Sequence, residues 1–308
     1  MIFACRFANI LYCGNFDVST DRIRCILTVK ITSDSTCDLS GELLEKYGID
    51  VVPLTVTLGD FSGHDGTDVT PETIYEFVDR SGQLPKSSAV SVGEYKKVFS
   101  SLREQGFEVV HINIGQQFSV CWQNACIAAE EVGGVWVVDS ENLSTGQGLV
   151  VLRAAELARE GISAEEIAQT CQSMTKQVEA SFVVNTIDYL YKGGRCSAVA
   201  AIGASLLHIK PSIEVTDGKM RPVKKYHGSI HHAIMTYVDD RLKERSDIDP
   251  QRIFITHTKV DAQTIEDVKT RIRQTQPEIR EILETTAGAT ITTHCGPGTL
   301  GVLFVRKG

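Results

Sequence analysis

The sequence predicts an α/β protein made of two domains that share one cleft, and three observations lead to this prediction. The chain has 308 residues, which is long for one typical domain and short for three. From about Val29 onward, short apolar runs alternate with helical stretches, as in a parallel sheet covered by helices. After about residue 175 this alternation is lost. We therefore expect a parallel-sheet α/β domain over residues 29–175 and an α+β domain over residues 176–308.

In the first domain the apolar runs predict strands, and the capped amphipathic stretches between them predict helices. The expected strands cover residues 30–33, 51–58, 108–114 and 135–138, and the expected helices cover residues 40–47, 71–80, 92–105, 119–131, 145–159 and 164–176. Connections of this length predict a parallel sheet with helices on both faces. Ligands of open α/β sheets bind at the carboxyl ends of the strands, so we expect a site there.

In the second domain, Asp217-Gly218 lies between two β-like runs and predicts a hairpin. Two glycines in Lys192-Gly193-Gly194-Arg195 predict a turn. The expected strands cover residues 181–185, 212–215, 220–224, 252–256, 281–285 and 299–305, and the expected helices cover residues 199–207, 230–243 and 262–274. Mixed strands and helices of this kind indicate an α+β unit.

The first 28 residues differ from the rest of the chain. They hold three cysteines and show neither a helix period nor a strand period. Arg6 and Asn9 interrupt any apolar core that a signal peptide would need. We expect residues 1–28 to be either a disordered extension or an extension that the native protein lacks. In the second case, the start codon of this sequence is placed too far upstream. Mass analysis of the N-terminus of protein made from its native gene tests this expectation.

Composition excludes several classes of function. A net charge of -8 without a basic stripe argues against nucleic-acid binding. Nine cysteines without a Cys-x-x-Cys pair favour free thiols in a reducing cytoplasm. No apolar run approaches the roughly 20 residues of a membrane helix, so we expect a soluble protein with at most transient membrane contact. His227, His231 and His232 lack nearby carboxylates or cysteines, and we expect no metal site.

Several polar segments have the chemistry to bind an anion. Asp34-Ser35-Thr36 directly follows the first expected strand, although such residues are more often simple helix caps. Ser87 and Ser88 lie in an expected loop, and Ser119 lies at the start of an expected helix. Each hydroxyl can donate a hydrogen bond, and exposed amides at a helix start add positive potential. For Ser119, an ordinary N-cap role explains the residue equally well.

Two glycine-rich segments complete the set of candidates. Gly193 and Gly194 allow close approach of the backbone to a ligand, and Arg195 offers a planar fork for an oxyanion; Arg195 in a structural ion pair is the alternative. His294-Cys295 precedes a Gly-Pro-Gly turn. Cysteine catalysis needs an aligned base, but adjacent side chains tend to point to opposite sides. We therefore expect His294 to hydrogen-bond a ligand headgroup.

Taken together, these segments resemble the DegV family of bacterial fatty-acid-binding proteins, and the resemblance covers Val29 to Lys307. The matching segments are residues 33–39, 139–140, 144–148, 189–195, 209–211, 217–219 and 294–298. The resemblance implies a two-domain fold that buries one long-chain fatty acid between the domains. It also implies a partner, an ATP-dependent fatty acid kinase that phosphorylates the presented carboxylate for phospholipid synthesis. This chain would then be the substrate-presenting subunit, without a cofactor or catalytic residues of its own.

The resemblance also implies roles for individual residues. Ser87, Ser88, Ser119 and His294 would bind the carboxylate. The residues near the headgroup or the partner-facing surface would be Arg195, Gly193, Gly194, Asp34 and Ser35. Ala89 and Val90 replace Gln and Pro of the family pattern, and Val120 and Cys121 replace Gly and Thr, which implies a different chain-length or headgroup preference. Two alternatives stay open: a module that binds a small metabolite or phosphate, and a hydrolase or transferase acting through Cys295 or Ser119.

Overall fold

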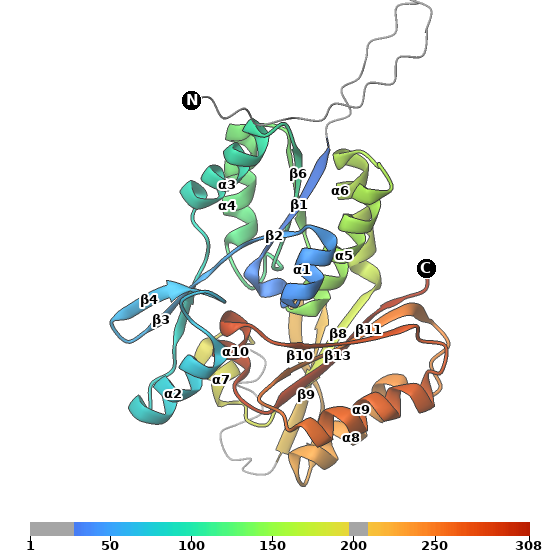
Figure 1. Ribbon diagram of the computed structural model, residues 1–308. Helices are drawn as coiled ribbons and strands as arrows, with labels where there is room; N and C mark the ends of the chain where they lie inside the picture. Colours follow the sequence, from blue (N-terminus) through green and yellow to red (C-terminus); the bar gives the residue numbers. More distant parts are fainter. Residues whose placement is uncertain (1–27, 197–208) are drawn as a thin grey trace, which may run out of the picture.

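The computed structural model describes residues 28–196 and 209–308 (Figure 1). The expected helix over residues 199–207, and the expected extension apart from residue 28, lie outside these residues. The fold is α/β, as predicted, with a parallel sheet in the first half of the chain and a mostly antiparallel sheet in the second. Among the described residues, no helix combines the length and the apolar character that a membrane span requires.

A four-stranded parallel sheet forms the first half of the fold, with the strand order β2-β1-β6-β7. Its strands are β1 (Val29–Asp34), β2 (Asp50–Val52), β6 (Glu108–Asn113) and β7 (Val135–Asp139). Helices cover both faces, as Figure 1 shows. On one face lie α3 (Val92–Glu104) and α4 (Cys121–Val132), and on the other lie α1 (Gly41–Tyr47), α5 (Thr145–Arg159) and α6 (Ala164–Met174).

A six-stranded sheet forms the second half, with the strand order β10-β9-β8-β13-β11-β12. Its strands are β8 (Val178–Val183), β9 (Ile209–Thr216), β10 (Lys219–His227), β11 (Ile248–Thr258), β12 (Glu281–Thr286) and β13 (Thr299–Arg306). All its neighbouring strands are antiparallel except β11 and β12. The hairpin predicted at Asp217-Gly218 connects β9 and β10.

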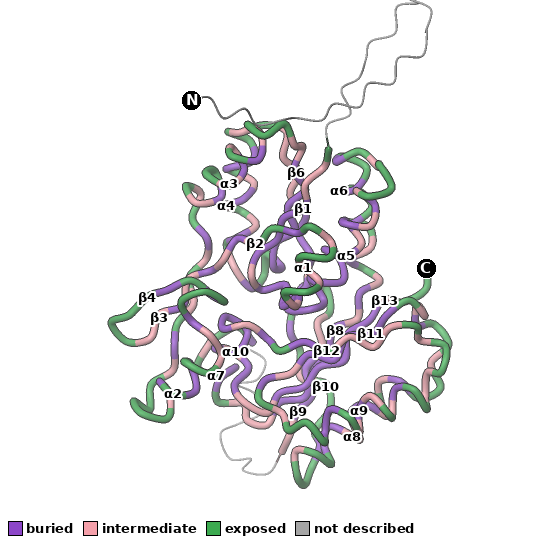
Figure 2. The backbone as a smooth tube through the Cα atoms, viewed as in Figure 1, coloured by how far each residue is buried: buried purple, intermediate pink, exposed green. Residues whose placement is uncertain are grey.

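One helix is packed between the two sheets. Helix α5 contacts β1 and β6 of the first sheet and β8 and β13 of the second, and most of its residues are buried, as the purple trace in Figure 2 indicates. The opposite face of the six-stranded sheet is covered by α8 (Ile230–Leu242) and α9 (Ala262–Thr275). The prediction that the two domains divide near residue 175 stays a prediction.

The expected strand over residues 51–58 is two strands in different sheets. Pro53 separates them, because proline has no N–H for a sheet ladder. The second of them belongs to a small antiparallel sheet of β3 (Thr55–Leu58), β4 (Phe61–His64) and β5 (Lys86–Ser88). The expected loop at Ser87 and Ser88 is therefore part of a strand. Helix α2 (Pro71–Ser81) packs beside this sheet.

Two short helices that were not predicted from the sequence lie next to the small sheet. Lys192 and Gly193 close α7 (Asp188–Gly193), and only Gly194 takes the left-handed turn conformation, with φ 68°. Helix α10 (Ala289–Cys295) ends with the segment Thr293 to Cys295. Helix α7 packs on α10, and α10 also contacts α2, β3 and β5. No helix was predicted over residues 289–295, because four of these seven residues are β-branched and disfavour a helix.

Candidate functional site

The site begins with a hydrogen bond between residues that are distant in the sequence. Ser87 lies on β5, and His294 lies on the last turn of α10, 207 positions further along the chain. The Ser87 hydroxyl and Nε2 of His294 are 2.8 Å apart. The next residue on the strand, Ser88, is exposed, since neighbouring strand residues face opposite ways. The structure thus brings Ser87 to His294 and leaves Ser88 outside the pair.

The surroundings of His294 keep its imidazole neutral. Part of the side chain remains exposed, but Nδ1 is buried and has no hydrogen-bond partner among the described residues. Burial, reinforced by the positive charge of Arg195, lowers the pKa of His294 to about 4. Gly193 lies directly against the ring, because an added Cβ there would come within 2.5 Å of Nδ1. Near neutral pH, His294 is therefore a neutral hydrogen-bonding group.

A cavity of about 50 Å³ borders this pair. Its described polar lining consists of Ser87, Ser119, Thr290, His294 and Arg195. The other described lining residues are apolar, namely Leu54, Ala89, Ile114, Phe118, Leu143, Leu190, Met220, Ile291 and Cys295. The exposed Arg195 side chain also donates a hydrogen bond to the carbonyl of Gly193 at 3.0 Å. Hydroxyls, a neutral imidazole and a guanidinium thus gather at one apolar cavity.

Ser119 lies two residues before the first residue of α4. Its hydroxyl donates to Sγ of Cys121 at 3.1 Å and accepts the backbone N–H of Cys121 at 3.3 Å. The helix starts later than expected, and Val120 occupies the N-cap position without a capping side chain. Ser119 therefore makes a cap-like bond and also lines the cavity. Its surroundings fit both roles considered for it, the helix cap and the ligand donor.

A second cavity, of about 30 Å³, extends the first toward the six-stranded sheet. The two cavities share Leu143, Ile291 and Cys295 as lining residues. Beyond these three, the second cavity is lined mainly by strands of the larger sheet, including Phe182 and Leu303. An apolar path thus leads from the polar cluster toward the interior between the two sheets.

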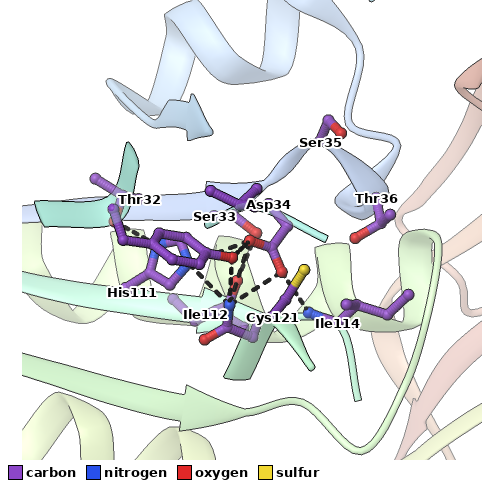
Figure 3. A network of polar contacts seen from close by, with 12 residues as sticks. Thr32, Ser33, Asp34, Ser35, Thr36, His111, Ile112, Ile114 and Cys121 are labelled. Atoms are coloured by element: carbon purple, nitrogen blue, oxygen red, sulfur yellow. Dashed lines mark hydrogen bonds and ion pairs between the residues drawn. The ribbon is translucent and has the colours of Figure 1, made fainter. Parts of the chain in front are cut away.

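Asp34 lies in a different environment, which Figure 3 shows. The carboxylate is completely buried and does not line either cavity. It accepts hydrogen bonds from the Tyr95 hydroxyl at 2.5 Å, the Asn113 amide at 3.1 and 3.2 Å, and the backbone N–H of Ile114 at 2.9 Å. Burial and the adjacent carboxylate raise the pKa of Tyr95. Asp34 thus supports the cavity from behind, because it anchors the backbone of Ile114.

Ser35 points away from the Asp34 network, as Figure 3 shows. Its hydroxyl donates to Oδ2 of Asp65 at 2.9 Å and accepts the backbone N–H of Leu54, a cavity residue, at 3.1 Å. Gly194 forms the turn after α7 and is absent from the described lining of both cavities. Asp34, Ser35 and Gly194 thus lie around the site without forming its surface.

The environment of Cys295 bears on the hydrolase alternative. Burial, together with the charge of Asp38, raises the pKa of the Cys295 thiol to about 12. His294 is bonded to Ser87 through Nε2, and no base is hydrogen-bonded to the thiol among the described contacts. A protonated thiol is a poor nucleophile, so this environment disfavours catalysis by Cys295. The described residues also include no cluster of three or more His, Cys, Asp or Glu side chains suited to a metal ion.

Sequence reasoning missed several residues of this site. Thr290, Leu143 and Ile291 line the cavities, and Asp65 accepts the backbone N–H of Thr290. None belongs to a local motif, because each reaches the site through contacts that span long stretches of sequence. The Pro53 break between β2 and β3 was the one local signal that residues 54–65 leave the parallel sheet.

Comparison with known proteins gives a consistent result. The family model for DegV, a family described as uncharacterised proteins, matches residues 28–307. A DegV domain-containing protein of Caldanaerobacter subterraneus subsp. tengcongensis is 32% identical over 281 residues, which cover 91% of this chain and 99% of that protein.

Solved structures show the same similarity. A DegV family protein from Thermus thermophilus, described by its fatty acid binding, superposes with a TM-score of 0.82 at 28% identity, covering 91% of this chain and 100% of that one. A stearic acid-binding protein from Eubacterium ventriosum superposes with a TM-score of 0.78 at 27% identity, covering 91% of this chain and 98% of that one.

Proposed function

Because this chain belongs to the DegV family, we propose that it binds one long-chain fatty acid and presents the carboxylate to a partner kinase. The observation that carries the proposal is the pairing of Ser87 with a neutral His294 beside Arg195, at one end of an apolar path. Relatives of known structure are described as binding fatty acids, stearic acid in one case.

The polar end matches the needs of a carboxylate. A carboxylate that leaves water must regain its hydrogen bonds. The hydroxyls of Ser87, Ser119 and Thr290 can donate to it, and the guanidinium of Arg195 supplies a positive charge. Ser88 is exposed and contributes no group to this cavity. In the proposed complex, one carboxylate oxygen remains available for the phosphoryl group.

The tautomer of His294 decides the direction of the hydrogen bonds. Nδ1 has no partner among the described residues, and an unpaired buried N–H is rarer than an unpaired acceptor. The proton therefore belongs on Nε2, which donates to the Ser87 oxygen. The Ser87 hydroxyl hydrogen is then free to point toward the ligand. Neutral His294 thus turns Ser87 into a donor for a carboxylate.

The acyl tail would follow the path past Leu143 and Ile291 toward the six-stranded sheet. Each buried methylene contributes about 0.8 kcal/mol, so the tail supplies most of the affinity. Cavities of about 50 and 30 Å³ are too small for a long chain. Binding therefore requires the side chains between the two cavities to move apart and join them into one tunnel.

The kinase partner is the second half of the proposal. Arg195 lines the cavity at the carboxylate end of the path, and its neighbours Tyr191 and Lys192 are exposed. A partner would reach the headgroup on this side. The chain would then act as a non-enzymatic substrate carrier in the cytoplasm, where acyl-phosphate feeds phospholipid synthesis. The buried, protonated thiol of Cys295 supports a carrier rather than a hydrolase.

The partner half has a direct test. The loaded protein is mixed with ATP and a purified fatty acid kinase of the same bacterium, and acyl-phosphate is trapped as the hydroxamate. We expect hydroxamate only when both proteins are present. If loaded protein yields no hydroxamate with an active kinase, the presenting role is wrong while the binding role still stands. If the protein binds phosphate and no fatty acid, the metabolite-binding alternative replaces the proposal.

A further inference from the structure

The start of α10 is held by carboxylates from the other end of the sequence. Oδ1 of Asp65 accepts the backbone N–H of Ala289 at 2.7 Å, and Oδ2 accepts that of Thr290 at 3.1 Å. Oδ1 of Asp38 accepts the backbone N–H of Gly288 at 2.9 Å. These amides lack partners within the helix. Each bond therefore connects the last quarter of the chain to its first.

Asp65 also holds the opposite wall of the first cavity. Its Oδ2 accepts the Ser35 hydroxyl at 2.9 Å, and that hydroxyl accepts the backbone N–H of Leu54 at 3.1 Å. The backbone N–H of Asp65 donates to the carbonyl of Leu54 at 2.9 Å. Leu54 lines the cavity on one side, and α10 contributes Thr290, Ile291, His294 and Cys295. One carboxylate thus joins two walls of the same cavity.

Helix α10 depends on such external support. It has seven residues, and helices this short are unstable by themselves. Its sequence includes Thr290, Ile291, Thr292 and Thr293, which are β-branched and weak helix formers. His294 lies one turn beyond the amides that Asp65 accepts, so any rotation or fraying of α10 moves the imidazole away from Ser87.

We propose that Asp65 is a positioning residue for ligand binding, which sets the place of His294 relative to Ser87 by fixing α10 to the Leu54 segment. This inference rests on the proposed function, because it assigns the headgroup to the Ser87–His294 pair. The Asp65 carboxylate has three hydrogen-bond partners, one hydroxyl and two backbone N–H groups, and all three act as donors. An asparagine amide would turn an NH₂ group toward at least one of them, and the buried donor would lose its partner.

Asp38 provides a matched control on the other side of Gly288. A Cβ at Gly288 would lie 3.1 Å from Oδ1 of Asp38 and 3.2 Å from Oδ1 of Asp65, so the two carboxylates flank this glycine closely. Burial is the main cause that raises the pKa of Asp38 to about 8, and the charge of Asp65 adds to it. The Ser144 hydroxyl lies 2.6 Å from Oδ2 and can accept a hydrogen bond from the protonated carboxyl group as well as donate one. An amide at position 38 therefore imitates the protonated acid.

The test compares Asp65→Asn with Asp38→Asn. Two quantities are measured: the Kd for a fluorescent long-chain fatty acid, and the ¹⁵N signals of the His294 ring in the ligand-free protein. We expect Asp65→Asn to raise the Kd by about tenfold or more and to shift the His294 signals toward those of an exposed histidine. We expect Asp38→Asn to leave both near the wild-type values, because the amide oxygen at position 38 can still accept the backbone N–H of Gly288 while the NH₂ group donates to Ser144.

A folded Asp65→Asn variant with wild-type Kd and unchanged His294 signals overturns the inference. If Asp65→Asn does not fold, Ser35→Ala decides, because it removes the hydroxyl between Asp65 and Leu54. Unchanged His294 signals in Ser35→Ala then overturn the inference, and shifted ones support it. Failure of the wild-type protein to take up any fatty acid instead contradicts the proposed function. The ring signals of ligand-free protein still test whether Asp65 positions His294.

Discussion

Gly193 and His294 are packed so closely that the glycine has no room for a side chain. A Cβ built on Gly193 would lie 2.5 Å from Nδ1 of the imidazole and 3.4 Å from its Cε1 atom. A Cβ atom cannot lie 2.5 Å from a nitrogen to which it is not bonded, so one of the two groups must shift, and the imidazole is the movable one. The close fit holds the ring in the position in which Nε2 meets Ser87.

We therefore expect Gly193→Ala to push His294 away from Ser87 and to weaken fatty acid binding by about tenfold. The measurement is a binding titration of delipidated protein. Gly93→Ala in α3 is the control, since its added Cβ meets nothing closer than Ser91 Oγ at 4.0 Å. Equal affinity of the two variants would show that the contact between Gly193 and His294 has no part in binding.

Ser87→Ala tests the carboxylate donor directly. Removal of the hydroxyl leaves Nε2 of His294 without its partner and the carboxylate without one donor, which costs about 1–3 kcal/mol of binding free energy. Ser88→Ala should bind like the wild type, because Ser88 is exposed on the other side of the strand. Calorimetry of both variants measures the difference. A larger loss in Ser88→Ala would reverse the assignment.

Ser119→Ala should also weaken retention of the carboxylate, by roughly 1–3 kcal/mol, because Ser119 lines the same cavity. The same titration measures it. The Ser119 hydroxyl also accepts the first amide of α4, so the melting temperature is recorded alongside. A variant that loses stability but binds as tightly as the wild type would assign Ser119 to helix capping alone.

Arg195→Gln should change the titration of His294. Burial is the larger cause of its low pKa, and the Arg195 charge is the smaller one. The variant should therefore raise the pKa of His294 above about 4 while leaving it below the ordinary 6.5. NMR titration of the ring carbons measures this value. Lys192→Gln is the control, because Lys192 is exposed on the same segment and should leave the titration unchanged.

Asp38 predicts a specific dependence of stability on pH. Its pKa is raised from 3.8 to about 8 in the folded protein, so the folded state keeps a proton that the unfolded chain releases. The stabilising contribution is complete below pH 3.8 and is lost as the pH rises through about 8. The unfolding free energy of wild type minus that of Asp38→Asn should fall across this range and level off above it. A difference that stays flat in urea denaturation from acid to alkaline pH would contradict this assignment.

Much of the architecture could be predicted because it depends on local patterns. The strands β1, β6 and β7 are apolar runs between helical segments, and the hairpin at Asp217-Gly218 carries its own turn signal. Helix α10 could not be predicted, since its β-branched residues disfavour a helix and the carboxylates of Asp38 and Asp65 that hold it lie more than 220 positions away.

The candidate site also has parts that the sequence could predict and parts that it could not. Ser87, Ser119, Arg195 and His294 were named from the sequence, and the structure gathers them around one cavity. Their pairing could not be predicted from the sequence, because the hydrogen bond between Ser87 and His294 joins residues 207 positions apart. Asp34 has the residue type and the sheet-edge position of a ligand residue. Buried donors from Tyr95, Asn113 and Ile114 occupy its carboxylate instead. No local sequence pattern predicts these contacts, because the donors are more than 60 positions away from Asp34.

Native mass spectrometry of the purified protein, followed by denaturing extraction and identification of any released lipid, tests the central claim most directly. We predict one equivalent of added mass that matches a free long-chain fatty acid, or stoichiometric uptake of one when fatty acids are added to delipidated protein. A mass without ligand that stays unchanged after incubation with fatty acids of different lengths and saturation would contradict the proposed carrier function.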